Sequence, residues 1–142
     1  AIAAEELFKR AQKEEIHLWG ISGYRSYKRQ EELFSSANGR SGVAPPGCSE
    51  HQTGLALDIS CPDENYELEE SFAKTKEGCW LARHCALFGF ILRYPKNKEE
   101  ITGFPFEPWH IRYTGIGLAS SLTLTGMTLE EYYERGLHLP PK

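Results

Sequence analysis

The stretch that decides the fold lies at residues 49–60 and reads Ser-Glu-His-Gln-Thr-Gly-Leu-Ala-Leu-Asp-Ile-Ser. It places an imidazole, His51, and a carboxylate, Asp58, among residues that are mostly small or apolar. An uninterrupted strand would hold these two side chains more than about 20 Å apart, at about 3.3 Å per residue. Gly54 lies between them and has access to positive φ. We therefore predict that the chain turns back near Gly54 and that Asp58 lies on a strand at the floor of a cleft.

A second short segment supplies the groups that the first one lacks. Glu107-Pro108-Trp109-His110 offers another imidazole and another carboxylate. Zinc in hydrolases takes three protein ligands and keeps one position open for water, whose pKa the ion lowers to roughly 7. The sequence thus predicts a metal site formed by His51, Asp58 and His110. Glu107 is left over as a general base that takes the proton of the water and passes it to the leaving amine.

An arginine precedes the second expected helix and completes the candidate site. Arg25 is always charged and is suited to stabilise the oxyanion of a tetrahedral intermediate. Each of these residues taken alone also fits an ordinary structural role. A His and an Asp at this spacing more often form hydrogen bonds or caps, Glu107 fits a surface carboxylate, and Arg25 fits an ion-pair partner.

Length and composition restrict the class of protein. The 142 residues, with 40% hydrophobic and 25% charged residues, are typical of one globular domain. A net charge of −4 argues against nucleic acid as a partner. The chain contains neither an apolar run of about 20 residues nor a secretion signal at its start. We therefore expect any membrane anchor or export signal to lie outside this sequence.

The four cysteines lack the spacing of a zinc finger. Cys48 and Cys61 bracket the opening stretch, so they form either a disulfide across the predicted turn or two small buried thiols. Cys79 and Cys85 lie on one predicted helix about 9 Å apart along its axis, which is too far for a direct bridge.

Helical periods and short alternating runs follow one another along the chain and predict an α+β fold with a small, mainly antiparallel sheet. The predicted helices cover residues 2–15, 26–34, 76–88, 115–122 and 128–136, and the predicted strands cover residues 17–21, 55–60, 90–94 and 109–113. Thr128 and Glu131 form a capping box at the start of the last helix. Residues 35–47 are rich in Ser, Asn, Gly and Pro and predict a loop at the rim of the site. We expect residues 1–142 to form a single catalytic domain.

Four blocks of the sequence together resemble one family. They read Ser-Gly-Tyr-Arg-Ser at 22–26, Ser-Glu-His-Gln-Thr-Gly-Leu-Ala-Leu-Asp at 49–58, Gly-Phe-Ile-Leu-Arg-Tyr-Pro at 89–95 and Glu-Pro-Trp-His-Ile-Arg-Tyr at 107–113. In this order they are similar to the VanY-type zinc D-alanyl-D-alanine carboxypeptidases, whose relatives include LdcB-like L,D-carboxypeptidases. The similarity covers about residues 16–117 and implies the fold shared with zinc D,D-dipeptidases and the Hedgehog amino-terminal domain.

The resemblance implies one zinc ion per chain, held by His51, Asp58 and His110, with Glu107 as general base and Arg25 at the scissile carbonyl.

It also implies that Ser49 and Gln30 contact the substrate, a peptidoglycan stem peptide that loses a terminal D-alanine outside the cytoplasmic membrane. The expected protein is an anchored or secreted monomer of the bacterial cell envelope. An L,D-carboxypeptidase acting on the tetrapeptide stem has the same catalytic residues, and we expect the loops at 35–47 and 93–106 to decide between the two. The alternative from another class is a non-catalytic peptidoglycan-binding module on the same fold, which would have no need of Glu107.

Overall fold

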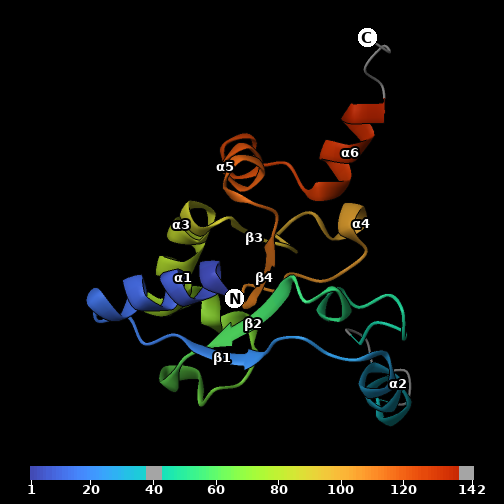
Figure 1. The fold of residues 1–142 in the computed structure, drawn as a ribbon, viewed down its shortest axis with the longest axis horizontal. Coiled ribbons are helices and arrows are strands. Elements are labelled where there is room, and N and C mark those ends of the chain that lie inside the picture. The colour runs from blue at the N-terminus through green and yellow to red at the C-terminus, as the bar shows by residue number, and fades with distance from the viewer. Residues whose placement is uncertain (38–42, 138–142) are drawn as a thin grey trace.

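The computed structural model describes residues 1–37 and 43–137, and in this part of the chain the helices surround a four-stranded antiparallel sheet (Figure 1). The strands lie side by side in the order β1 (Trp19–Ser22), β2 (Ala56–Ser60), β4 (His110–Tyr113) and β3 (Phe90–Leu92). The α-helices are α1 (Ile2–Lys13), α2 (Tyr27–Ser36), α3 (Lys76–His84), α4 (Glu99–Thr102), α5 (Ile116–Thr125) and α6 (Leu129–Leu137). The 3-10 helices of the described residues are η1 (Glu50–Thr53), η2 (Pro62–Glu64), η3 (Glu70–Lys74) and η4 (Cys85–Phe88). The predicted α+β class and antiparallel sheet are confirmed.

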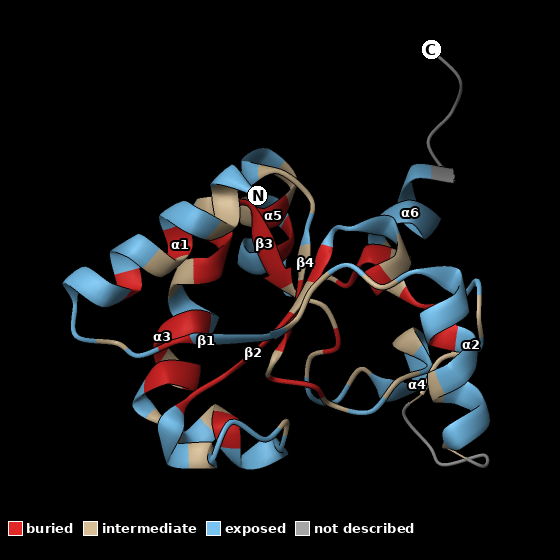
Figure 2. Ribbon diagram, turned by 60° about the horizontal axis from the view of Figure 1, so that its bottom comes forward, coloured by how far each residue is buried: buried red, intermediate tan, exposed pale blue. Residues whose placement is uncertain are grey.

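One face of the sheet carries the main core. Ile59 on β2 and Ile111 on β4 are fully buried, and they belong to one apolar cluster with Leu7 of α1 and Leu81 of α3. Figure 2 shows the buried residues on β2 and on the inner sides of α1 and α3. Because side chains alternate along a strand, the neighbours of Ile59 and Ile111 point to the opposite face.

The register of the strands determines which polar residues meet on that opposite face. Asp58 on β2 lies directly across from His110 on β4. On the other side of β2, Ser22 at the end of β1 is also paired with Asp58. Directly opposed residues of an antiparallel pair have Cβ atoms about 5 Å apart. The sheet therefore brings Asp58 and His110 together, and it places the segment that follows β1 next to them.

The region from α3 to β3 differs from its predicted form. The single helix expected at residues 76–88 is α3 followed by the tighter helix η4. Gly89 then has φ +83°, and an added Cβ would lie 2.8 Å from the ring of Tyr113. Glycine is thus required here both by the backbone conformation and by close packing.

The last two helices pack as a smaller unit against β3. Ile91, Ala119, Leu122 and Leu129 form a second apolar cluster. The expected capping box of α6 is confirmed, because the Thr128 amide donates to Glu131 and the Glu131 amide donates to the Thr128 hydroxyl. The helix predicted at 115–122 extends to Thr125.

All four cysteines of the sequence lie among the described residues. Cys48, Cys61, Cys79 and Cys85 are all free thiols, so the disulfide considered for Cys48 and Cys61 is absent from the structure. Cys61 is buried, as expected for a small apolar residue, whereas Cys48 is exposed. Within residues 1–37 and 43–137 no helix has the length and apolar character needed to cross a bilayer.

Candidate metal centre

The turn at Gly54 brings His51 to Asp58. Residues Glu50–Thr53 form η1, which ends at Gly54 with φ +72° in the left-handed region. The chain then reverses into β2, and His51 Nε2 lies 3.1 Å from Asp58 Oδ2. The predicted reversal is confirmed, because a short 3-10 helix and a left-handed glycine replace the extended path that would separate the two residues.

His110 reaches the same carboxylate from β4. Its Nδ1 lies 2.8 Å from Asp58 Oδ1, so each oxygen of Asp58 has one imidazole beside it. All three residues are buried, and one ligand atom from each lies within 4.8 Å of the others. The rings of His51 and His110 meet edge to face with centroids 5.1 Å apart.

A backbone carbonyl determines the tautomer of His51. Its Nδ1 lies 2.8 Å from the Gly23 carbonyl oxygen. A carbonyl only accepts, so Nδ1 carries the hydrogen and the lone pair of Nε2 is free to bind a metal. Such a hydrogen bond on the far nitrogen is the usual way in which a protein orients a metal-binding histidine.

The donor set fits a zinc ion. Nitrogen and oxygen donors each about 2.1 Å from one tetrahedral ion lie roughly 3.4 Å apart. His51 Nε2 lies 3.1 Å from Asp58 Oδ2 and His110 Nδ1 lies 2.8 Å from Asp58 Oδ1, so each oxygen of Asp58 has one imidazole nitrogen within about this distance. Two imidazoles and one carboxylate give three ligands with room for a fourth position. His51, Asp58 and His110 would therefore hold the metal.

Without a metal the cluster behaves as an ion pair. Burial alone would raise the pKa of Asp58, but hydrogen bonds with His110 and His51 outweigh it and lower that pKa to about 2. Burial would lower the pKa of His110, yet its contacts with Asp58 and Glu50 raise it to about 9. At neutral pH the metal-free cluster thus holds an imidazolium against a carboxylate.

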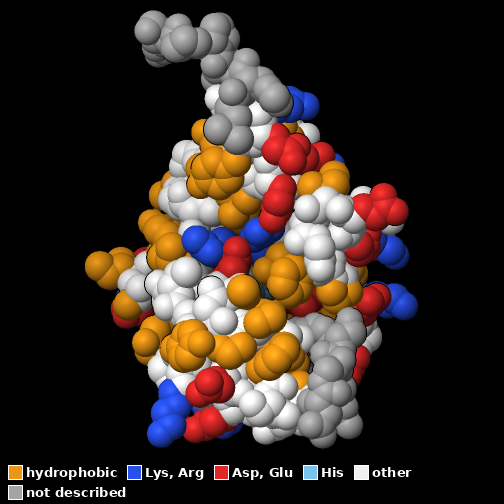
Figure 3. Space-filling view, turned by 90° about the vertical axis from the view of Figure 1, so that its right-hand side faces the viewer, with side chains coloured by type: hydrophobic (Ala, Val, Ile, Leu, Met, Phe, Trp, Pro, Cys, Tyr) orange, Lys and Arg blue, Asp and Glu red, His pale blue; other side chains and the backbone are white. Residues whose placement is uncertain are grey.

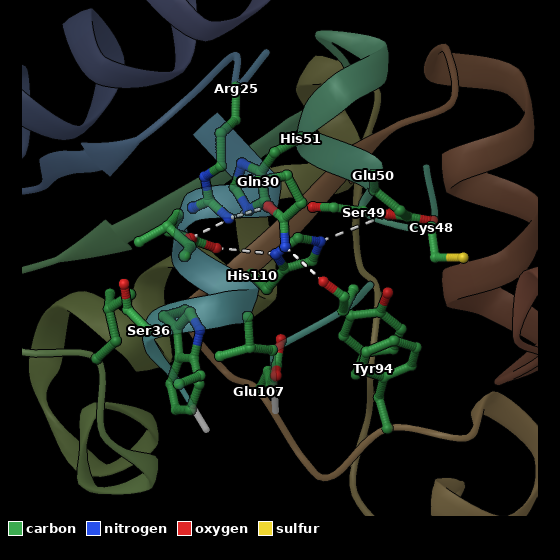
Figure 4. A pocket seen from close by; sticks show the side chains of 18 residues that line it. Arg25, Gln30, Ser36, Cys48, Ser49, Glu50, His51, Tyr94, Glu107 and His110 are labelled. Atoms are coloured by element: carbon green, nitrogen blue, oxygen red, sulfur yellow. Dashed lines mark hydrogen bonds and ion pairs between the residues drawn. The ribbon is translucent and has the colours of Figure 1, made fainter. Parts of the chain in front are cut away.

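A cavity of about 490 Å³ lies beside these residues, and Figure 4 shows the side chains around it. Glu107 lines this cavity and is 9% exposed. Burial raises the pKa of Glu107 to about 7 against the opposing effect of the His110 charge, and the Asp58 charge adds to the rise. A carboxylate with a pKa near neutrality is suited to take and return a proton.

Arg25, Gln30 and Ser49 line the same cavity. Arg25 Nη1 donates to Gln30 Oε1 at 2.9 Å and its Nη2 donates to Ser22 Oγ at 2.8 Å. Gln30 is 1% exposed, and its amide nitrogen donates to the Ala44 carbonyl at 2.6 Å. The guanidinium is therefore held in place from two sides. The structure brings every predicted site residue to one cavity.

Residues 38–42 of the predicted rim loop lie outside the described residues. Its flanks, Ala37, Val43 and Ala44, line the cavity. Phe104, from the predicted connection at 93–106, lines it as well.

The sequence did not point to Glu50 or Tyr94. Glu50 accepts a hydrogen bond from Arg93 at 2.7 Å and forms an ion pair with Arg112, whose Nη1 lies 3.1 Å from Glu50 Oε1. Its other oxygen lies 3.5 Å from His110 Nε2. Tyr94 stacks on the His110 ring with centroids 5.1 Å apart. The partners of Glu50 lie on β4 and directly after β3, far from it in the sequence, so no local spacing could reveal them. For Tyr94 the available signal was its place at the end of the strand expected at residues 90–94.

Comparison with known proteins places these features in a family. The family model for VanY, D-alanyl-D-alanine carboxypeptidase, matches residues 1–116. YodJ of Bacillus subtilis (strain 168) is 45% identical over 142 residues, covering 95% of this chain and 52% of YodJ. The chain thus spans about half the length of that relative.

Two solved structures show the same fold. The LdcB LD-carboxypeptidase has a TM-score of 0.88 and 45% identity, covering 93% of this chain and 65% of that one. The E175A mutant of the D,D-pentapeptidase VanY in complex with Zn(II) has a TM-score of 0.75 and 36% identity, covering 92% of this chain and 79% of that one. This chain belongs to the VanY D-alanyl-D-alanine carboxypeptidase family.

Proposed function

We propose that this chain is a zinc-dependent carboxypeptidase that removes the terminal D-alanine from peptidoglycan stem peptides, with residues 1–142 as one catalytic domain. The observation that carries the proposal is the buried His51, Asp58 and His110 cluster in one cavity with Glu107. A relative of the same fold was solved with Zn(II). Because such a substrate lies in the cell wall, we place the activity outside the cytoplasmic membrane.

The roles of the residues follow from their positions. A zinc ion, when bound, supplies Lewis acidity and lowers the pKa of a water molecule to roughly 7. Glu107 takes the proton of the attacking water and later donates it to the leaving amine, which its raised pKa favours. Arg25, fixed by Gln30 and Ser22, stabilises the oxyanion that develops on the scissile carbonyl.

Two further residues are proposed to contact the peptide. Ser49 and Gln30 line the cavity, and Ser49 immediately precedes η1. The amide of Gln30 also holds Arg25 and the Ala44 carbonyl, so Gln30 has the additional part of fixing Arg25.

An L,D-carboxypeptidase acting on the tetrapeptide stem is the second candidate. The observation that favours it is the likeness to the LdcB LD-carboxypeptidase, at a TM-score of 0.88 against 0.75 for VanY. The residues that hold the metal and the base do not separate the two activities, because both cleave a peptide bond to a terminal D-alanine.

The test is mass spectrometry of synthetic tetrapeptide and pentapeptide stems incubated with zinc-loaded protein. We expect loss of one alanine from the pentapeptide. Loss from the tetrapeptide alone assigns the L,D activity, and cleavage of neither peptide indicates a non-catalytic binding module. Glu107→Gln should abolish cleavage, whereas Glu100→Gln removes an exposed carboxylate on α4 and should leave it unchanged.

A further inference from the structure

The ring of His110 has a carboxylate at each nitrogen. Nδ1 faces Asp58 at 2.8 Å, and Nε2 faces Glu50 Oε2 at 3.5 Å. If Nδ1 is the ligand atom, Nε2 must carry the hydrogen, and a carboxylate is the acceptor that fixes it there. Glu50 is thus placed to determine which nitrogen of His110 is free to bind a metal.

Glu50 is itself held by two arginines. Arg93 Nε donates to Glu50 Oε1 at 2.7 Å, and Arg112 Nη1 lies 3.1 Å from the same oxygen. With one oxygen occupied in this way, Oε2 is left for His110. The side chains of Glu50 and Arg93 are 14% and 11% exposed, so water screens this pair less than a surface pair.

The other edge of the Arg93 guanidinium is bound by the last helix. Its Nη1 and Nη2 donate to the two oxygens of Glu130 on α6 at 3.0 Å and 2.5 Å. This paired geometry fixes the plane of the guanidinium as well as its position. Figure 3 shows acidic and basic side chains gathered near the centre of the face that carries α2, α4 and α6.

The charges of this network balance. Two carboxylates, Glu50 and Glu130, face two guanidinium groups, Arg93 and Arg112. Without Glu130 the other three side chains of the network would together carry a net positive charge beside the cavity. Arg93 would also lose the partner that orients it toward Glu50.

We propose that α6 contributes to the metal centre. Glu130 on this helix positions Glu50 through Arg93, and Glu50 orients His110 for metal binding. This inference rests on the proposed zinc function. The family model ends at residue 116, so Glu130 lies beyond the part of the chain that it matches. Both glutamates are positioning residues, since they act through His110.

The experiment is a competition titration of metal-free protein with Zn²⁺ against a chromophoric chelator. Removing a partner of a metal-binding histidine typically weakens affinity by roughly 10–100-fold. We expect a loss of this size for Glu50→Gln and of roughly tenfold for Glu130→Gln. The visible spectrum of the Co²⁺-substituted protein should change in both variants, since it reports ligand geometry.

Two further variants separate positioning from other causes. Glu131 is the neighbouring carboxylate on α6, and it accepts hydrogen bonds from Lys98. Glu131→Gln removes its charge and should leave the zinc affinity unchanged. Arg93→Lys keeps the charge but loses the planar fork that binds Glu130 through two N–H groups while a third donates to Glu50, so it should resemble Glu130→Gln. Thermal unfolding of each variant checks that α6 stays folded.

The outcomes distinguish this inference from the proposed function. If wild-type protein binds zinc and Glu130→Gln binds it equally well, with the same Co²⁺ spectrum, the role of α6 is overturned and the proposed function stands. If Glu131→Gln weakens binding as much as Glu130→Gln, the effect is one of charge or of helix stability, and the inference is also overturned. If the wild-type protein binds no zinc, both fail.

Discussion

His110 is a protonated residue in the metal-free protein at neutral pH, because its pKa is raised to about 9. A metal ligand must give up that proton, so binding and deprotonation are linked. We predict that Zn²⁺ binding at pH 7.5 releases about one proton, and that affinity rises roughly tenfold per pH unit until the pKa is passed. Calorimetry in buffers of different ionisation enthalpy measures the proton release. An affinity that is flat between pH 7 and pH 9 would contradict the linkage between zinc binding and a proton on His110.

Glu107 is predicted to act in turnover and to leave metal binding unaffected. Its carboxylate lines the cavity but is absent from the group of close ligand atoms among the described residues. Glu107→Gln should therefore retain zinc at the wild-type stoichiometry and lose roughly 10²–10⁴-fold in kcat, the usual contribution of a general base. Metal analysis and steady-state kinetics on the same preparation check this. A variant with near wild-type kcat would remove Glu107 from the mechanism.

The identities of the site residues could be predicted from the sequence because they lie in short motifs that resemble a known family. Glu50 shows what such motifs leave out. It stands between two residues of the site, yet its partner Arg93 is 43 positions away. Its role depends on the register of β3 and β4 and on the docking of α6, and none of these leaves a pattern in the local sequence.

At the scale of elements, the ends of two short helices provide a matched pair of glycines. Gly54 ends η1, which carries His51, and Gly103 ends α4, which carries none of the proposed metal ligands, with φ of +72° and +75°. An added Cβ would meet nothing closer than 3.9 Å at Gly54 and nothing within 4 Å at Gly103. Alanine at either position is therefore strained by its backbone conformation and not by a clash.

We predict that Gly54→Ala and Gly103→Ala each lower the free energy of unfolding by roughly 1 kcal/mol. Only Gly54→Ala should weaken zinc binding, because relief of the strain at residue 54 moves the η1 backbone that carries His51. Chemical denaturation gives the stability, and zinc competition gives the affinity. Equal zinc affinity in the two variants would show that the turn tolerates the change without moving His51.

Boundaries of elements were harder to predict than their presence. The apolar spacing of residues 76–88 indicated one helix, since the period alone does not distinguish an α-helix from the 3-10 turn that follows it. The 3-10 helix η1 was likewise expected only as a bend. Its four residues are too few to show a period, although they bring His51 to Asp58.

At the scale of the whole molecule, the site lies between parts of the chain that are distant in sequence. His51 comes from η1, Asp58 from β2 and His110 from β4. A ligand that binds only the folded state stabilises it by about 2.7 kcal/mol at a free concentration of one hundred times its Kd. We predict that zinc at this ratio raises Tm by roughly 5–10 °C for a domain of this size. Differential scanning calorimetry measures the shift, and an unchanged Tm would mean that the metal does not join the three elements.

The class of the fold and its antiparallel sheet could be predicted, whereas the order β1-β2-β4-β3 could not. The order depends on how β2 and β4 pair across a long connection, and their alternating patterns permit several neighbours. That pairing sets Asp58 opposite His110 and thereby creates the site.

The zinc-dependent activity is tested most directly by measuring alanine release from a stem peptide while Zn²⁺ is added to metal-free protein. We predict no release without metal, a linear rise with added zinc, and a plateau at one equivalent per chain, with Asp58→Ala inactive throughout. Release at the full rate without any metal, or none at one equivalent with either peptide, would contradict it.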